Sequence, residues 1–171
     1  MLITFVVAYF LGILKYTICM IILLMPYRAA SGGFHLKTHI GCIVSTTLYY
    51  CGIAKISINC IFTTNLAKFL ATLSVWIFGM IMVKLYAPAD TENVPILRKK
   101  ERHQKKILSY IFLSTGLFIS LIIPNNTISN ILILGNLIQS IMITRLAYKL
   151  TNNKYGYEVY KEGETSLENA T

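Results

Sequence analysis

Long apolar runs fill most of this chain, and their length limits what it can fold into more than any other feature. Five of them can be drawn, at Ile3–Met25, Ile40–Ile58, Leu66–Leu85, Ile107–Ile123 and Ile128–Tyr148. Each is near the roughly 20 residues that an α-helix needs to cross a bilayer. Only 13% of the 171 residues are charged, whereas a soluble domain has about a quarter. We therefore predict an all-α, polytopic integral membrane protein with about five transmembrane or re-entrant helices.

The distribution of basic residues predicts the orientation of these helices, because lysine and arginine favour cytoplasmic loops. Six of them lie between Arg98 and Lys106, in the segment 87–106, whereas the loop 124–127 holds no charge. Residues 87–106 are therefore expected to form a cytoplasmic loop. Counting spans places residues 28–42 and the tail 151–171 on the same side. Residues 1–150 would form one membrane-embedded domain, and the polar tail is predicted to be disordered.

The first apolar run fits this orientation least well. The same count places Met1 outside the cell, although no polar leader precedes the run. Two arrangements would remove the difficulty: the first run is re-entrant, or a helix that normally precedes it is missing. The run carries Lys15 within it and is expected to end at Pro26, because proline interrupts helices.

A polar segment, Arg28–Cys42, interrupts the apolar pattern and carries the residues best suited to chemistry. Ionisable groups at membrane depth are costly, so they indicate function. A histidine here would act as a general base and Cys42 as a nucleophile, since a neighbouring imidazolium favours the thiolate. On one straight helix His35 would stand about 10 Å from Cys42, whereas His39 would be its natural helical partner.

Glycines change this comparison. Gly32 and Gly33 precede His35, and Gly41 lies beside the cysteine. Glycine tolerates backbone conformations closed to other residues, so the chain could turn back and bring His35 toward the thiol. Local geometry therefore leaves the two nearby histidines about equally placed as the base.

Less specific explanations of this segment remain open. It could be an interfacial loop with incidental histidines, or its glycines could serve only close helix packing. His35, His39 and Cys42 could also supply three ligands to zinc, although no glutamate lies near to act as a base. An alternative of another class is a non-enzymatic membrane transport or structural subunit whose polar segment lines a path. Thiol reactivity separates the classes, because an enzyme needs one hyper-reactive cysteine at the inner face.

Charges elsewhere in the chain narrow the choice. No Asp or Glu precedes Asp90, which argues against a carboxylate-pair hydrolase or an oxygen-ligand metal site in the first half. The net charge of +9 follows the membrane topology, so no nucleic-acid partner is expected. The basic cluster serves as a topology signal, and in a sharper interpretation it also docks an acidic peptide or an anionic lipid. The residues for such docking are Arg98, Lys99, Lys100 and Arg102.

The other cysteines are not expected to take part in chemistry. They lie in apolar surroundings, where a cysteine usually acts as a small buried hydrophobe. They also lack the CxxC spacing of a zinc ribbon or a redox pair. These residues are Cys19, Cys51 and Cys60.

Two blocks of the sequence resemble a known family. The first is Arg28-Ala-Ala-Ser-Gly-Gly-Phe-His35, with Cys42 seven residues later, and the second is Tyr86-Ala-Pro-Ala-Asp-Thr-Glu-Asn-Val-Pro95, followed by the basic run. Both resemble segments of the accessory gene regulator protein B family, which are membrane cysteine endopeptidases that process quorum-sensing prepeptides in Gram-positive bacteria. The likeness covers most of the chain. The chain departs from the family pattern by beginning closer to the first block than family members typically do.

The resemblance implies specific roles. His35 matches the family's catalytic histidine and Cys42 its catalytic cysteine, so His39 is set aside. An acyl-thioester on the enzyme would then be attacked by a cysteine within the precursor, releasing a thiolactone-ringed peptide. Expected partners are a precursor with an amphipathic leader and an internal cysteine, membrane lipids and a second copy in a homodimer; no metal or cofactor is implied. Candidates for oxyanion stabilisation or substrate positioning are Arg28, Ser31, Gly32, Gly33 and Gly41.

Overall fold

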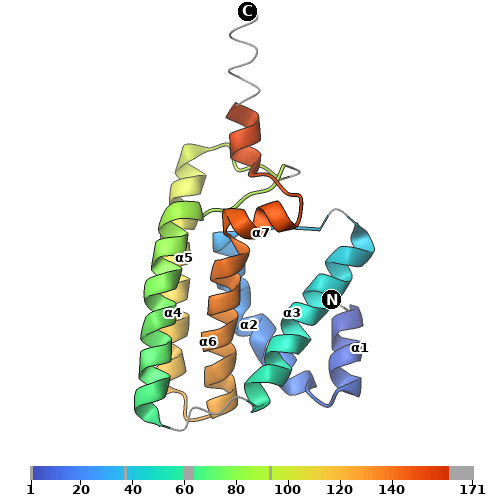
Figure 1. The fold of residues 1–171 in the computed structure, drawn as a ribbon, viewed down its shortest axis with the longest axis vertical. Coiled ribbons are helices and arrows are strands. Elements are labelled where there is room, and N and C mark those ends of the chain that lie inside the picture. Colours follow the sequence, from blue (N-terminus) through green and yellow to red (C-terminus); the bar gives the residue numbers. More distant parts are fainter. Residues whose placement is uncertain (1, 37, 60–63, 93, 162–171) are drawn as a thin grey trace, which may run out of the picture.

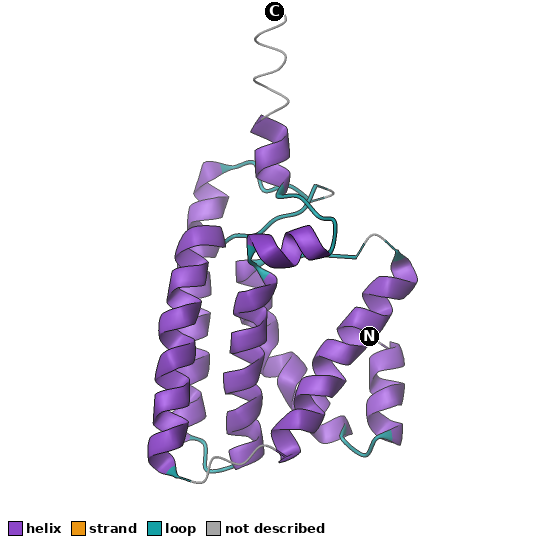
Figure 2. Ribbon diagram, viewed as in Figure 1, coloured by secondary structure: helices purple, strands orange, loops and turns teal. Residues whose placement is uncertain are grey.

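The computed structural model describes residues 2–36, 38–59, 64–92 and 94–161, and most of them are helical (Figure 1). Figure 2 shows helices and loops throughout these ranges, with no named strand in them. The all-α prediction is confirmed. The helices are α1 (Leu2–Phe10), α2 (Leu14–Ser31), α3 (His39–Asn59), α4 (Asn65–Tyr86), α5 (Lys99–Ile122), α6 (Asn126–Met142) and α7 (Arg145–Leu150), and a further helical turn spans 156–161.

Three helices of the described part, α3, α4 and α5, are long and apolar enough to cross a membrane. They coincide with the second, third and fourth predicted spans. Helix α4 begins where the Thr64 side chain accepts a hydrogen bond from the Ala67 N–H, and α6 begins in the same way at Asn125 and Ile128. Both are N-caps, which satisfy amide groups that a helix start leaves without an intrahelical partner.

The first apolar run is not one straight helix. The chain turns back after α1 and continues as α2 (Figure 1). The turn lies at residues 11–13, where Gly12 has a φ of +67°, a left-handed conformation that glycine adopts readily. This shape agrees with the re-entrant arrangement. The expected end at Pro26 is wrong, because α2 continues through Pro26 to Ser31. Prolines are tolerated inside membrane helices whose neighbours compensate for the lost backbone bond.

The loop expected at 87–106 is also shorter than the prediction. Helix α5 begins at Lys99, so the basic residues from there onward lie on a helix. Lysine, glutamate and arginine are good helix formers, and Glu101 pairs with Lys105 one turn later at 3.4 Å. The last predicted span likewise divides, because α6 ends at Met142 and α7 restarts at the N-cap residue Thr144.

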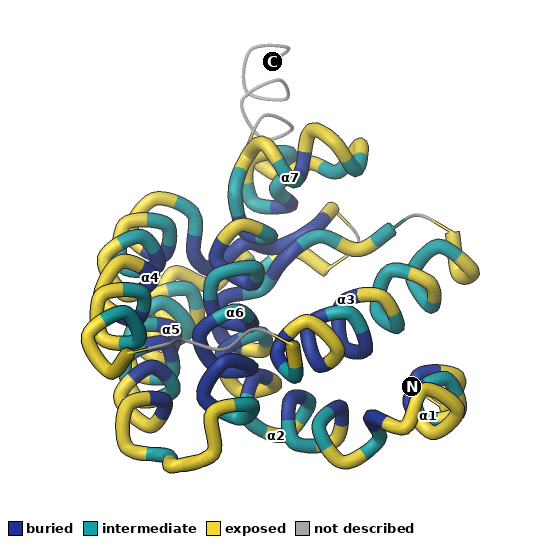
Figure 3. The backbone as a smooth tube through the Cα atoms, turned by 60° about the horizontal axis from the view of Figure 1, so that its bottom comes forward, coloured by how far each residue is buried: buried dark blue, intermediate teal, exposed yellow. Residues whose placement is uncertain are grey.

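Helix α6 lies at the centre of the bundle and packs against α2, α3, α4 and α5. Buried residues concentrate on α6 and on the helix surfaces that face it (Figure 3). Its approach to α2 is close, since a Cβ atom at Gly135 would collide with the Leu24 side chain. Small residues permit such contacts between membrane helices. This central helix carries polar residues that reach the candidate site.

The start of the predicted disordered tail has a defined path. Tyr155 stacks on Tyr148 of α7 with ring centroids 4.3 Å apart, and its hydroxyl donates to the Ile143 carbonyl at 2.8 Å. Tyr157 lies under the guanidinium of Arg102, 4.3 Å from its ring centroid. These contacts hold Tyr155 and Tyr157 against the bundle, in a segment whose sequence shows no apolar periodicity. Residues 162–171 lie outside the described ranges.

Candidate functional site

The polar segments of the chain meet at one end of the bundle (Figure 1). This end holds the last turn of α2, the first turn of α3, the connection from α4 to α5, and α7. The two sequence blocks with a family resemblance lie here. Residues far apart in the chain can therefore contribute to one site.

A backbone bridge joins the two blocks. Gly32 pairs with Ala89 in a parallel bridge, in which the Ala89 N–H donates to the Ser31 carbonyl at 2.8 Å. The Gly33 N–H donates to the Ala89 carbonyl at 2.9 Å. Gly32 has a φ of +78°, and a Cβ atom there would collide with the Ala89 carbonyl oxygen. Glycine is therefore required at position 32, and the chain bends there before His35.

Gln139 of α6 holds the same segment from inside the bundle. Its Nε2 donates to the Ser31 Oγ at 3.0 Å and to the Gly32 carbonyl at 2.7 Å. The Arg28 guanidinium donates to its Oε1 at 3.1 Å. Sequence reasoning missed this residue because it lies in an apolar run. The available signal was an amide side chain at membrane depth, where polar groups are usually functional.

His35 lies on the edge of a cavity of about 390 Å³. Partial burial lowers the pKa of the His35 imidazole below 6.5, and the positive charge of Arg28 lowers it further. The neutral imidazole therefore predominates at neutral pH, and a general base needs this form. The charged and titratable residues that line the same cavity are Arg28, His35, Tyr50, Asp90 and Lys105.

Cys42 lies in the first turn of α3, half-buried, with its N–H donating to the Thr38 carbonyl at 3.0 Å. It is not among the residues that line the His35 cavity. Within the described ranges no hydrogen bond joins Cys42 to His35 or His39, so the structure places both expected catalytic residues at one end of the bundle without pairing them. The described residues also contain no group of three or more metal-binding side chains arranged around an ion.

The candidates for oxyanion stabilisation differ in whether their polar groups are already engaged in hydrogen bonds within the protein. Ser31 is fully buried and its hydroxyl accepts from Gln139. The Gly41 N–H donates to the Thr38 Oγ1 at 3.1 Å, which caps the start of α3. Arg28 lines the His35 cavity, and its guanidinium also lies 5.4 Å from the centroid of the Tyr49 ring. Arg28 is therefore the charged candidate among the residues that line this cavity.

The basic cluster divides into two parts. Arg102 pairs with the buried carboxylate of Asp90 at 3.1 Å, and this carboxylate also accepts from the Ile96 N–H at 2.9 Å. The Tyr148 hydroxyl lies 3.0 Å from the Ala89 and Asp90 carbonyls. Arg102 therefore supports the connection from α4 to α5. The cluster residues that remain exposed for docking are Arg98, Lys99 and Lys100.

The remaining cysteines are placed as follows. Cys51 is buried, with its Sγ 3.7 Å from the Thr4 carbonyl, and Cys19 is half-buried. Cys60 lies outside the described residues. Cys19 and Cys51 are free thiols, as Cys42 is.

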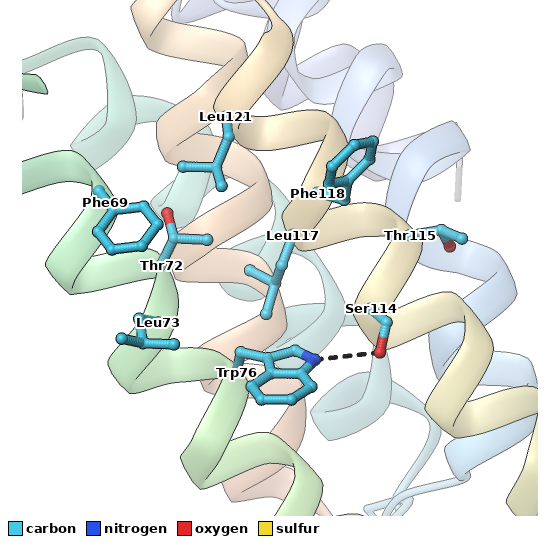
Figure 4. A pocket seen from close by; sticks show the side chains of 9 residues that line it. All are labelled: Phe69, Thr72, Leu73, Trp76, Ser114, Thr115, Leu117, Phe118 and Leu121. Carbon is cyan, nitrogen blue, oxygen red and sulfur yellow. Dashed lines mark hydrogen bonds between the residues drawn. The ribbon is translucent and has the colours of Figure 1, made fainter.

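A second cavity, of about 460 Å³, opens between α4 and α5. Figure 4 shows Trp76 directed toward Ser114, and its Nε1 donates to the Ser114 Oγ at 3.1 Å. Its other walls are mostly aromatic and aliphatic, and its lining residues include neither cysteine nor histidine. This cavity therefore offers neither the thiol nor the imidazole that the expected chemistry needs.

Comparison with known proteins decides the family. The model of the family described as accessory gene regulator B matches residues 1–143. This chain belongs to that family. Its membership and its three long apolar helices make it a membrane protein. The resemblance inferred from the two sequence blocks is confirmed.

Curated relatives are similar over most of the chain. A putative AgrB-like protein of Clostridium acetobutylicum is 29% identical over 153 residues, which cover 90% of this chain and 71% of the relative. A putative AgrB-like protein of Listeria innocua is also 29% identical, over 88% of this chain and 72% of the relative. The accessory gene regulator protein B of Staphylococcus aureus strain JH9 is 31% identical, over 83% and 72%. No solved structure matches.

Proposed function

We propose that this protein is a cysteine endopeptidase of the bacterial cell membrane that cleaves the precursor of a quorum-sensing peptide and promotes its cyclisation to a thiolactone. Family membership supports this role in general terms. The observation that carries the chemistry is the position of His35, whose largely neutral imidazole borders a cavity. Cys42 lies outside this cavity but at the same end of the bundle. The neighbouring bridge between residues 32 and 89 fixes the backbone that leads to it.

The reaction would proceed in two transfers of the acyl group. His35 takes the proton from the Cys42 thiol, and the thiolate attacks the scissile carbonyl of the precursor. The C–N bond breaks, the leaving amine takes the proton back from His35, and an acyl thioester remains on Cys42. A cysteine thiol within the precursor then attacks this thioester, which forms the ring thioester and returns the thiol of Cys42. One thioester replaces another, so the energy of the activated acyl group is conserved.

Because His35 and Cys42 are not paired in the free protein, binding of the precursor would have to bring them together. Catalytic hydrogen bonds are often long in free enzymes and shorten in the complex. Binding of the precursor would bring His35 toward the first turn of α3. Because the residues from Gly32 to Phe34 are anchored, the backbone up to Phe34 would stay in place during this movement.

The same end of the bundle would face the cytoplasm in a multi-pass protein. The exposed basic residues of the α5 start lie at this end and agree with the preference of lysine and arginine for the inner side. They would dock an acidic part of the precursor near the cavity. Arg102 would contribute mainly through its pair with Asp90.

The test is substitution of the nucleophile with a matched control. Cys42→Ser should abolish cleavage of a synthetic precursor in proteoliposomes, because an alcohol is far harder to ionise with the same base. The control replaces the other cysteines by alanine and should keep cleavage. A precursor that lacks its own cysteine should leave an acyl adduct on Cys42, located by mass spectrometry. An active Cys42→Ser protein, or an adduct on another residue, would overturn the proposal. The control carries Cys19→Ala, Cys51→Ala and Cys60→Ala.

A non-enzymatic transport subunit is the competing class. It predicts ordinary thiol reactivity at Cys42, whereas the enzyme predicts that Cys42 is alkylated well below pH 8.5 once His35 lies beside the thiol and takes up its proton. Alkylation rates measured against pH with bound, uncleavable precursor separate the two. A Cys42 that reacts no faster than Cys19 would favour the transport subunit.

A further inference from the structure

We infer that Gln139 is a positioning residue for this reaction, acting as a two-sided clamp that sets the place of His35. The inference rests on the proposed function, because positioning has meaning only where His35 works as the base. No sequence motif marks Gln139, and it lies on α6, over 100 residues from the segment it holds. Its side chain is completely buried.

The orientation of the Gln139 amide follows from its partners. An arginine side chain has donors only, so the Oε1 must face Arg28, which donates to it at 3.1 Å. The NH₂ group then faces two acceptors, the Ser31 Oγ at 3.0 Å and the Gly32 carbonyl at 2.7 Å. Both ends of the amide are therefore used. A residue without both a donor and an acceptor cannot hold these groups at once.

The clamp fixes the backbone immediately before His35. Gly32 is held by Gln139, and the next residue, Gly33, donates to the Ala89 carbonyl at 2.9 Å. Phe34 then packs edge-on against Tyr148, with ring centroids 6.5 Å apart. The chain reaches His35 through three consecutive anchored residues. Gln139 is the anchor that comes from the central helix.

The clamp also holds a charge that acts on the base. Arg28 lowers the His35 pKa, and Gln139 accepts a hydrogen bond from that same guanidinium. The other charged or titratable groups around this cavity are Tyr50 from α3, Asp90 from the connection between α4 and α5, and Lys105 from α5. Asp90 is paired with Arg102. Loss of the clamp should therefore change the titration of His35 as well as its position.

The experiment compares two changes at Gln139 with one control. Gln139→Met keeps the approximate volume and removes both ends of the clamp. Gln139→Glu keeps an acceptor for Arg28, loses both donors and adds a negative charge. The control is Asn136→Leu, one turn earlier on α6, where a buried amide donates only to the Leu132 carbonyl of its own helix.

We expect both Gln139 variants to lower kcat by about 10- to 100-fold, because small misplacements of a catalytic group have effects of this size. KM should change little, since Gln139 is buried. The control should keep kcat within about 3-fold. Folding is verified by circular dichroism and thermal unfolding. If Gln139→Met does not fold, the nearly isosteric Gln139→Glu decides the outcome.

A second readout does not depend on cleavage. Diethylpyrocarbonate modifies neutral histidine, so its rate at His35 against pH, followed by peptide mass spectrometry, reports the titration of that residue. The midpoint should rise toward the ordinary 6.5 in both Gln139 variants and stay low in Asn136→Leu. If the Gln139 variants keep wild-type activity and the His35 midpoint is unchanged, Gln139 is not a positioning residue, although the proposed cleavage reaction would be unaffected. A wild type that never cleaves would instead overturn the proposed function, and the midpoints would still test the clamp.

Discussion

Replacing Gly32 with alanine should damage this protein more than any other single added methyl group at the site. A Cβ atom there would meet the Ala89 carbonyl carbon at 2.8 Å and its nitrogen at 3.1 Å, besides colliding with its oxygen. These are backbone atoms, which cannot rotate away as a flexible side chain can. The bridge between the two blocks would have to open.

The magnitude follows from two contributions. Gly32 has a φ of +78° and a ψ of −151°, a region essentially restricted to glycine, where another residue costs about 1–3 kcal/mol. Opening the bridge breaks the hydrogen bonds from the Ala89 N–H to Ser31 and from the Gly33 N–H to Ala89, each worth about 1 kcal/mol. The sum is about 3–5 kcal/mol, which is a large part of the stability of a typical domain.

Two glycines provide controls. A Cβ atom at Gly12 would meet nothing within 4 Å, but its φ is +67°, so Gly12→Ala should cost only about 1–2 kcal/mol of strain. A Cβ atom at Gly52, within α3, also meets nothing, and its φ is not positive. Gly52→Ala should be neutral or stabilise by up to about 1 kcal/mol.

The assay is denaturant unfolding of the purified proteins in mixed micelles, together with precursor cleavage. Gly32→Ala should show the lowest unfolding free energy of the three and no cleavage. Gly12→Ala should lose stability but keep cleavage, because the turn between α1 and α2 lies away from the site. If Gly32→Ala behaved like Gly52→Ala in both measurements, the bridge would not hold the site and the reasoning would be wrong.

Three further predictions concern the charged groups of the site. His35→Ala should abolish cleavage and His39→Ala should keep most of it; loss in the His39 variant alone would reverse the assignment. Because a general base must be unprotonated, kcat/KM should rise with pH through a midpoint below 6.5. Arg28→Gln should raise that midpoint and Arg28→Lys should not, and a midpoint above 6.5 in the wild type would exclude His35 as described. Replacing Lys99 and Lys100 by glutamine should raise KM for an acidic precursor and weaken the salt dependence of KM. If the substitutions instead invert the protein in the membrane, so that a label added from outside reaches this segment while KM is unchanged, the two lysines act only as a topology signal.

The sequence predicted the membrane helices well because apolar length is a direct physical requirement of the bilayer. It offered a re-entrant first run as one of two arrangements but did not locate the reversal at Gly12, because a turn within an apolar run changes neither composition nor hydropathy. It ended the first helix at Pro26, although the penalty for one proline can be offset by packing that the sequence does not display. It read residues 99–106 as a loop because their charges hid their helix propensity.

The sequence indicated one local feature of the candidate site but not its partners. The bend at Gly32 and Gly33 was expected, and both adopt a positive φ. The partners of that bend were not predictable, because Ala89 contributes only its backbone and Gln139 lies in a different apolar run. Pairing between such distant groups depends on how the helices pack, and a single sequence does not reveal it.

The bundle leaves apolar helix surface exposed and buries polar side chains at its centre beside an apolar core. Only 22% of the most apolar stretch of α4, and likewise of α5, is buried, whereas the central α6 buries the polar side chains of Asn136, Gln139 and Ser140. Between lipid-exposed helices the hydrophobic effect gives little cohesion, so packing and hydrogen bonds hold them together. Water that enters the interior competes for those bonds. The cohesion of this bundle therefore depends on how far its surroundings exclude water, and we expect a hydrated detergent micelle to weaken the Gln139 contacts before it unwinds a helix.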